Sequence, residues 1–211
     1  IFLLLHARKY DLLQVYHLSF RSMFWLFLFK ILRPRSRTYL KLDANERILN
    51  YPTKGFKGMI NQYLFRKIDL VSVETIALQK PLEEIWKRAI VNIPNGYFAT
   101  QNEYVPYNDK KNIILTVGRI GASEKRTELL LEAFAAFYEQ CQDWHLELVG
   151  PIQLGFENYI NQYFLKYPQL KDIVIFTGSI QDRKTLFEKY AEAKIFCLTS
   201  KYEGFCISLV E

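Results

Sequence analysis

The chain has 211 residues, of which 50% are hydrophobic and 24% are charged. This composition excludes an intrinsically disordered protein and supports a sizeable core in one large or two smaller domains. A formal net charge of +6 fits an anionic substrate, an acidic lipid surface or nucleic acid. Because the sequence has no zinc-finger spacing, no Arg/Gly-rich stretch and no RNP-like strand, nucleic acid is not expected as a partner.

The cysteines and the apolar runs indicate a location in the cytoplasm. Cys141, Cys197 and Cys206 are widely spaced and form no C-x-x-C pair, as expected in a reducing compartment. The apolar run 23–29 is interrupted by Lys30 and is far shorter than the roughly 20 residues of a membrane span. The chain begins inside an apolar run without Met and ends within a predicted helix, so we expect a fragment of a longer protein.

Alternating strands and helices in the first half predict a parallel sheet. A helix tail is expected over 1–9, and Ser19 is placed to cap a helix that begins at Phe20 and ends before Pro34. Strands connected by helices at this spacing are typical of βαβ units. The strands are expected at 11–17, 37–43, 69–73 and 89–93, and the helices at 20–32, 55–67 and 76–88.

Two features of this half have a functional and a structural interpretation. The cluster Arg33, Arg35 and Arg37 either contacts anionic lipid head groups or is a solvated loop, which we favour. The aromatic segment 24–29 would supply the apolar part of such a lipid surface. Pro94-Asn95-Gly96 is a turn signal followed by polar residues. We therefore expect an N-terminal domain over 1–95, a linker over 96–111 and a C-terminal domain over 112–211.

Asp43 and His17 stand at the carboxyl ends of their predicted strands, which is the edge where open α/β sheets bind ligands. Asp43 is a candidate active-site carboxylate, and the alternative is that it caps a helix. His17 is a candidate for the same side of the site, and the alternative is a core histidine.

The second half predicts a second parallel sheet, with strands at 113–117, 144–149, 173–179 and 195–198. Asp182 is placed to cap the helix that leads to the last strand. The helix after the first strand has apolar residues at the spacing of one buried face. These residues are Leu130, Ala133, Phe134, Phe137, Tyr138 and Cys141.

A basic loop follows strand 113–117, with Gly118 and Arg119 at its start and Lys125 near its end. A departing nucleoside diphosphate accumulates negative charge, which Arg119 and Lys125 are suited to stabilise by charge-assisted hydrogen bonds. The structural alternative is a solvated loop. The segment is neither G-x-G-x-x-G nor a Walker loop, so neither a nicotinamide cofactor nor ATP is indicated.

Two glutamates separated by seven residues, Glu203 and Glu211, close the chain. The polar residues 199–204 predict a strand-to-helix loop, and a helix is expected from Phe205 onward. A helix that begins at the carboxyl end of a parallel strand directs unpaired N–H groups toward a phosphate. Carboxylates beside it are suited to accept hydrogen bonds from sugar hydroxyls, and the structural alternative is two ordinary surface acids.

The segment Glu203-Gly-Phe-Cys-Ile-Ser-Leu-Val-Glu211 resembles the E-x7-E motif of the retaining GT-B glycosyltransferases of family 4, the glycosyl transferases group 1. Further matches follow the order of that family. They are Pro94-Asn95-Gly96, Gly118-Arg119, Lys125, Gly150 and Thr199-Ser200. The resemblance implies an α/β protein with two Rossmann-like domains, each with a parallel sheet and both incomplete in this sequence. The acceptor would bind to the first domain and the sugar nucleotide to the second.

The resemblance also implies roles for single residues. Arg119 and Lys125 would bind the donor diphosphate, and Glu203 would hold the donor sugar. These three are the catalytic candidates. The remaining donor-binding candidates are Gly118, Gly178, Ile180, Gly204, Phe205, Cys206 and Glu211, of which Glu211 would contact the ribose. Asp43 and His17 are weaker acceptor-side candidates, because relatives carry a His-Asp pair where Lys41-Leu42-Asp43 stands here.

The implied activity is of the hexosyltransferase type. A sugar would pass from a nucleoside-diphosphate sugar to an acceptor hydroxyl with retention at the anomeric carbon, in bacterial polysaccharide or glycolipid synthesis. The donor is a substrate, so no cofactor is expected, and without a D-x-D motif no metal is expected either. The expected partners are the nucleotide sugar, a carbohydrate or lipid-linked acceptor and an anionic membrane surface at the inner face of the membrane. The alternatives are a non-catalytic scaffold or lipid-surface module and a sugar-nucleotide epimerase.

Overall fold

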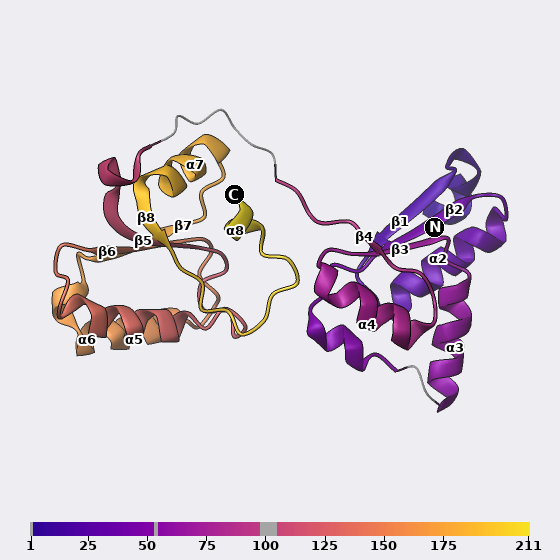
Figure 1. Cartoon of the computed structure of the whole chain (residues 1–211), viewed down its shortest axis with the longest axis horizontal. Coiled ribbons are helices and arrows are strands. Elements are labelled where there is room, and N and C mark those ends of the chain that lie inside the picture. The colour runs from indigo at the N-terminus through magenta and orange to yellow at the C-terminus, as the bar shows by residue number, and fades with distance from the viewer. Residues whose placement is uncertain (1, 53–54, 98–104) are drawn as a thin grey trace. The chain divides into compact units, whose positions relative to one another are not determined.

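The computed structural model describes residues 2–52, 55–97 and 105–211, and Figure 1 shows its elements in chain order. The chain forms two compact units. The first comprises the chain up to Asn95 together with Glu203–Phe205, and the second comprises the rest, from Gly96 onward. Of the predicted linker 96–111, residues 98–104 lie outside the described part of the chain.

The first unit is built on a four-stranded parallel sheet with the order β1-β2-β3-β4. The predicted strands and helices of this half are found with ends that differ by at most one or two residues. The strands are β1 (Leu12–Tyr16), β2 (Arg37–Lys41), β3 (Leu70–Val73) and β4 (Val91–Asn92). The helices are α1 (Phe2–His6), α2 (Phe20–Leu32), α3 (Gly55–Arg66) and α4 (Ile76–Trp86), with 3-10 turns η1 (Ala7–Lys9) and η2 (Glu46–Asn50).

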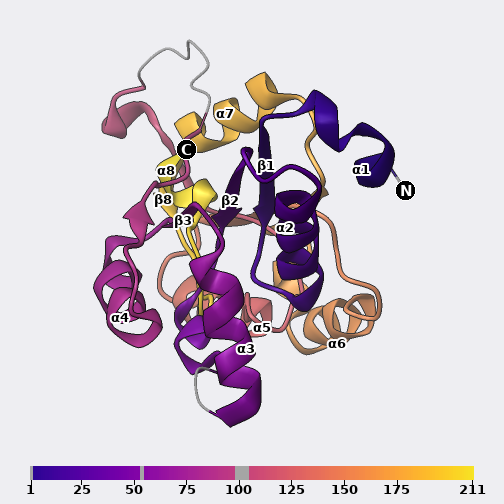
Figure 2. The same cartoon turned by 90° about the vertical axis from the view of Figure 1, so that its right-hand side faces the viewer.

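Helices α2, α3 and α4 lie on one side of this sheet (Figures 1 and 2). The strand order steps across the sheet in one direction, so right-handed crossovers place all three helices on the same face. Side chains of β1 alternate accordingly, since Leu13 and Val15 pack against the core whereas Leu12 and Tyr16 are exposed. The core of the first unit therefore lies between one face of the sheet and these helices.

Helix α2 begins at Phe20 as predicted, but the aromatic surface expected over 24–29 is only partly present. The Ser19 side chain caps it by accepting a hydrogen bond from the Ser22 N–H at 3.1 Å. Phe29 is 0% exposed and is therefore not part of an aromatic surface, because it lies three residues after the buried Leu26, on the same side of the helix. Phe24 and Trp25 are 47% and 38% exposed.

The second unit is built on a parallel sheet with the order β7-β6-β5-β8. Its strands are β5 (Lys111–Val117), β6 (His145–Val149), β7 (Val174–Gly178) and β8 (Ala193–Phe196). Its helices are α5 (Thr127–Tyr138), α6 (Glu157–Lys166), α7 (Arg183–Glu192) and α8 (Ile207–Val210), with 3-10 turns η3 (Tyr107–Asp109) and η4 (Pro168–Leu170). The strand order reverses between β5 and β8, and such a switch point opens a ligand crevice at the carboxyl ends of the strands.

Helices α5 and α6 cover one face of this sheet and α7 covers the other (Figures 1 and 2). The predicted buried face of α5 is partly wrong, because Ala133 is exposed whereas Leu131 and Ala135 are buried. The reason is that α5 packs against α6 as well as the sheet, and the Tyr163 hydroxyl donates to the Leu131 carbonyl at 2.9 Å. Asp182 caps α7 as predicted. In the part of the chain that the structure describes, no helix is long and apolar enough to cross a membrane.

Candidate functional site

Backbone hydrogen bonds bring three loops together at the carboxyl edge of the second sheet. The Gly118 N–H donates to the Val149 carbonyl and the Gly150 N–H to the Gly178 carbonyl, both at 2.9 Å. These bonds join the loops that follow β5, β6 and β7. A cavity of about 280 Å³ lies among them, and its lining includes Gly118, Arg119, Gly150, Ser179, Ile180 and Leu186.

Gly150 permits the closest of these approaches. A Cβ atom at this position would stand 1.8 Å from the Gly118 carbonyl oxygen, and the backbone has a φ of +143°. No side chain fits there, so a glycine is required for the loops after β5 and β6 to touch. Gly178, one of the predicted donor-binding residues, has a φ of +71° at the end of β7.

The basic loop after β5 is closed by its own hydrogen bonds. The Gly121 N–H donates to the Thr127 hydroxyl at 2.9 Å, and the Lys125 N–H to the Ala122 carbonyl at 2.8 Å. This closure turns the Lys125 side chain back over the start of the loop, where its Nζ would be 4.0 Å from a Cβ on Gly118. Gly118 and the Lys125 side chain therefore lie together.

Arg119 is paired with Glu124 within the same loop. The Arg119 side chain is 67% exposed, so it can turn toward a ligand without unfolding the loop. The pKa of Glu124 is held below its ordinary value by a hydrogen bond from its own backbone N–H and by the charges of Arg119 and Lys125. Glu124 therefore remains ionised, and an anionic ligand of Arg119 would have to displace it.

The loop after β8 is fastened to the basic loop. The Thr199 hydroxyl is within 3.0 Å of both the Lys125 and the Arg126 carbonyls, and the Lys201 N–H donates to the Glu124 carbonyl at 2.7 Å. Nearby, the buried Ser200 hydroxyl has no hydrogen-bond partner among the described residues and lines a small cavity that Lys125 also borders. Residues far apart in the sequence thus meet at the switch point between β5 and β8.

Glu211 has a partner for each carboxylate oxygen. Arg183 Nη2 lies 3.0 Å from Oε1, and the Tyr190 hydroxyl donates to Oε2 at 3.1 Å. The Glu211 side chain is 7% exposed, which contradicts the alternative of an ordinary surface acid. Burial raises the pKa of Tyr190, and the charge of Glu211 raises it further. The tyrosine is therefore protonated and donates at physiological pH.

The start of the last helix corrects a prediction. We expected a helix from Phe205, but α8 begins at Ile207 and has four residues. Cys206 is its N-cap and makes no capping hydrogen bond through its side chain, because a thiol is a weak acceptor. Glu203, Gly204 and Phe205 lie in the loop between β8 and α8 and are grouped with the first unit.

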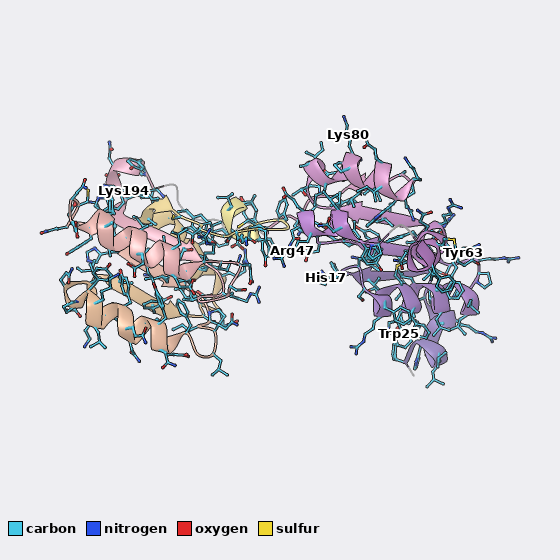
Figure 3. All side chains as sticks on the ribbon, turned by 90° about the horizontal axis from the view of Figure 1, so that it is seen from below. His17, Trp25, Arg47, Tyr63, Lys80 and Lys194 are labelled. Carbon is cyan, nitrogen blue, oxygen red and sulfur yellow. The ribbon has the colours of Figure 1, made fainter. Side chains whose placement is uncertain are left out.

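In the first unit, His17 and Asp43 come together at the carboxyl ends of β1 and β2. Their Nδ1 and Oδ2 atoms are 3.8 Å apart, and both residues have a left-handed backbone, with φ of 60° and 43°. They line a cavity of about 420 Å³ with Arg47, and His17 and Arg47 lie at the same end of this unit (Figure 3). The two structural alternatives are wrong, because the His17 side chain is 66% exposed and Asn45 caps η2.

Three residues that contact the candidate sites or the turn next to one of them were not identified from the sequence. Arg183 and Tyr190 hold Glu211, and their spacing of seven residues on α7 gives no signal until that helix is placed. Glu74 is 2% exposed after β3, and its Oε2 accepts a hydrogen bond from the Ala44 N–H at 3.3 Å. This contact supports the turn that carries Asp43. Among the described residues, no cluster of His, Cys, Asp or Glu is arranged to hold a metal ion.

Two α/β units, each built on a four-stranded parallel sheet, are the architecture of the GT-B fold. The profile of the family "Glycosyl transferases group 1" matches residues 99–211. The chain belongs to this family.

Solved glycosyltransferases have a similar fold. The pneumococcal O-GlcNAc transferase GtfA, in complex with UDP and GlcNAc, matches with a TM-score of 0.73 and 15% identity over 99% of this chain and 42% of its own. Anabaena Alr3699/HepE, in complex with UDP and glucose, matches with a TM-score of 0.68 and 19% identity over 99% of this chain and 58% of its own. The lipopolysaccharide outer core galactosyltransferase WaaB matches with a TM-score of 0.62 and 16% identity over 99% of this chain and 56% of its own.

The chain thus spans about half the length of these solved neighbours. No curated protein is significantly similar to it in sequence.

Proposed function

We propose that this protein transfers a sugar from a nucleoside-diphosphate sugar to an acceptor hydroxyl, with retention at the anomeric carbon. The observation that carries the proposal is that Arg119, Lys125 and Ser200 line one cavity at the carboxyl edge of the second sheet. Arg119 also lines a second cavity at this edge. Family membership supports the same class of reaction. Because solved neighbours contain UDP, UDP is the first nucleotide to test.

In the proposed reaction, the bond between the anomeric carbon and the donor phosphate oxygen breaks, and the acceptor oxygen bonds to the same face of that carbon. The proton of the acceptor hydroxyl passes to the departing diphosphate, so no covalent protein intermediate is needed. Arg119 and Lys125 stabilise the charge that develops on the diphosphate, for which Arg119 leaves Glu124. Glu203 accepts hydrogen bonds from the donor sugar and Glu211 from the ribose.

Thermal-shift measurements with UDP, GDP, ADP and CMP and their common sugars test this proposal. A ligand that binds only the folded protein raises its stability, by about 2.7 kcal/mol at a hundredfold excess over Kd. We expect one nucleotide to protect the wild type and Lys125→Ala and Glu211→Ala to weaken that protection. Lys184→Ala is the matched control, because this lysine is 79% exposed and pairs only loosely with Glu188, at 4.0 Å. Protection by none of the nucleotides would favour a scaffold, and recovery of an epimerised donor would favour an epimerase.

For the acceptor, we propose the cavity of about 420 Å³ that His17 and Asp43 line in the first unit. A carboxylate accepts hydrogen bonds from sugar hydroxyls, and Asp43 presents one that is 38% exposed. Asp43→Asn should lower transfer by about tenfold or more through the loss of a charge-assisted hydrogen bond, with UDP binding unchanged. The control is Asp11→Asn, since Asp11 is 90% exposed and contacts Arg33. Equal activity of the two variants would rule out this role.

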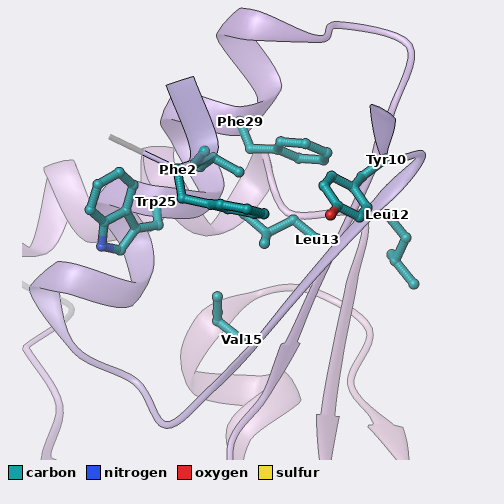
Figure 4. A pocket seen from close by; sticks show the side chains of 8 residues that line it. Phe2, Tyr10, Leu12, Leu13, Val15, Trp25 and Phe29 are labelled. Carbon is teal, nitrogen blue, oxygen red and sulfur yellow. The ribbon is translucent and has the colours of Figure 1, made fainter. Parts of the chain in front are cut away.

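A membrane surface is the further partner we propose, with a lipid-linked acceptor of bacterial polysaccharide or glycolipid synthesis. Phe20 and Ile31 on α2 are 79% and 57% exposed, and Arg21 and Arg35 are exposed near them in sequence. Beside α2 lies an apolar cavity of about 530 Å³, into which Trp25 and Phe2 face (Figure 4). Apolar side chains next to basic ones suit an anionic interface, which would place the protein at the inner face of the membrane as a peripheral protein.

Sedimentation with vesicles distinguishes this partner from a solvated helix. We expect binding to vesicles that contain anionic lipid, weakened by added salt, and little binding to neutral ones. The variant Phe20→Ser/Phe24→Ser should bind several-fold less, whereas Leu165→Ser, at an 83% exposed site on α6, should bind like the wild type. Equal sedimentation with both vesicle types, or none, would remove the membrane from the proposal.

A further inference from the structure

Helix α7 presents one stripe of side chains toward Glu211. Arg183, Phe187 and Tyr190 stand at i, i+4 and i+7, so they share a face of this helix. Arg183 and Tyr190 each contact one oxygen of the Glu211 carboxylate. Phe187 lies between them, is 7% exposed, and has the Arg183 guanidinium 5.1 Å from its ring centroid.

Packing holds both partners of Glu211 in place. The Tyr190 ring lies 6.1 Å from the Phe187 ring and 5.5 Å from the Phe196 ring on β8. The first turn of α7 is fixed by Asp182, which accepts hydrogen bonds from the Thr185 N–H at 2.9 Å and its hydroxyl at 2.7 Å. The two donors that face Glu211 therefore belong to a well-supported helix and not to a mobile loop.

The Glu211 carboxylate still has acceptor capacity. An ionised carboxyl group accepts about four hydrogen bonds, two at each oxygen. Among the described residues, Arg183 supplies one donor to Oε1 and Tyr190 one donor to Oε2. One position on each oxygen remains, and the carboxylate is oriented before a ligand arrives. Two adjacent hydroxyl groups match this arrangement, and the ribose of a nucleotide carries such a pair.

The same helix borders the candidate nucleotide cavity. Leu186, on α7, lines the cavity of about 280 Å³ together with Ser179 and Ile180, which come shortly before the helix. A displacement of α7 would therefore alter the cavity wall and the donors to Glu211 at the same time. This links the two parts of the site that a nucleotide would occupy.

We propose that Arg183 and Tyr190 are positioning residues that orient Glu211 toward both ribose hydroxyls and so determine selectivity for ribonucleotides over 2′-deoxyribonucleotides. The inference rests on the proposed function, because it needs a nucleotide in this site. Its physical basis is the cost of leaving a position on a buried, pre-oriented carboxylate without a donor. A site built to bind a hydroxyl rejects the analogue that lacks it more strongly than a purely apolar pocket does.

Calorimetric titration of the purified full-length protein with UDP and 2′-deoxy-UDP tests the inference. We expect the wild type to bind UDP at least about tenfold more tightly than 2′-deoxy-UDP. Tyr190→Phe and Arg183→Gln should each lower the affinity for UDP about fivefold or more and change the affinity for 2′-deoxy-UDP by less than about twofold. The reason is that only UDP has both ribose hydroxyls to donate to the oriented Glu211 carboxylate. The matched control is Tyr167→Phe, which removes a hydroxyl that donates to Glu132 Oε2 at 2.9 Å elsewhere in the second unit.

A double-substitution cycle shows whether Tyr190 acts through Glu211. In a Glu211→Gln background, Tyr190→Phe should leave the ratio of the two affinities unchanged, because the oriented carboxylate is already lost. The inference is overturned if Tyr190→Phe and Arg183→Gln lower the affinities for UDP and 2′-deoxy-UDP by the same factor. It is also overturned if the wild type binds the two nucleotides equally well. Failure of the wild type to bind any nucleoside diphosphate would instead overturn the proposed function, and the inference with it. Circular dichroism melting of each variant confirms that it is folded.

Discussion

At the scale of single residues, Asp69 links the charge state of the first unit to its stability. Its carboxylate accepts hydrogen bonds from Lys30 Nζ at 2.9 Å and from the Thr38 N–H and hydroxyl at 2.8 Å. Burial alone would raise the pKa of Asp69, but hydrogen bonds from Lys30 and Thr38 outweigh it and lower the pKa from 3.8 to about 2. A carboxyl group with a lower pKa in the folded state stabilises above its unfolded pKa and loses that contribution as the pH falls through the folded value.

We therefore expect the free energy of unfolding to decrease by about 2 kcal/mol between about pH 4 and pH 2 through this one group. Urea unfolding followed by the fluorescence of the buried Trp86 measures it. Asp69→Asn should remove this part of the pH dependence and leave a less stable protein at neutral pH, whereas Asp11→Asn, at a 90% exposed site, should behave like the wild type. An unchanged pH dependence in Asp69→Asn would show that other groups control acid stability.

At the scale of elements, the site depends on how closely the loops after β5 and β6 approach each other. Gly150→Ala puts a methyl group 1.8 Å from the Gly118 carbonyl oxygen, so the loops must separate. We expect a loss of at least about 2 kcal/mol in stability and markedly weaker UDP binding. Gly155→Ala is the control, because its φ of +90° is also unfavourable but its Cβ meets nothing within 4 Å. Similar stability and UDP affinity in the two variants would contradict the importance of the contact.

At the scale of the whole molecule, each unit has a hydrophobic core of its own. Trp86 is buried in the core of the first unit, and Trp144 packs against that of the second. Domains with separate cores generally unfold as separate units. We expect two calorimetric transitions. UDP should raise the midpoint temperature of only one of them, the transition that Trp144 fluorescence reports, because a ligand stabilises the unit that binds it. Trp144→Phe identifies that signal, and a single transition that UDP shifts as a whole would disprove this independence.

The sequence by itself determined the elements and their order. The strands and helices of both halves follow from alternating apolar runs, and Ser19 and Asp182 cap their helices as expected from residue type alone. Both depend on neighbours within a few residues, which is the range that a sequence pattern covers. The motif that ends at Glu211 likewise indicated the family, which the profile match over 99–211 shows.

Only the tertiary structure decided which of these residues meet. His17 and Asp43 are 3.8 Å apart, although 25 residues lie between them in the printed sequence. The partners of Glu211 lie on α7, whose apolar pattern does not predict what its polar residues contact. The buried face of α5 was likewise set by its contact with α6. Periodicity fixes the direction of a side chain relative to its own helix or strand, whereas contacts and burial depend on where the other elements pack.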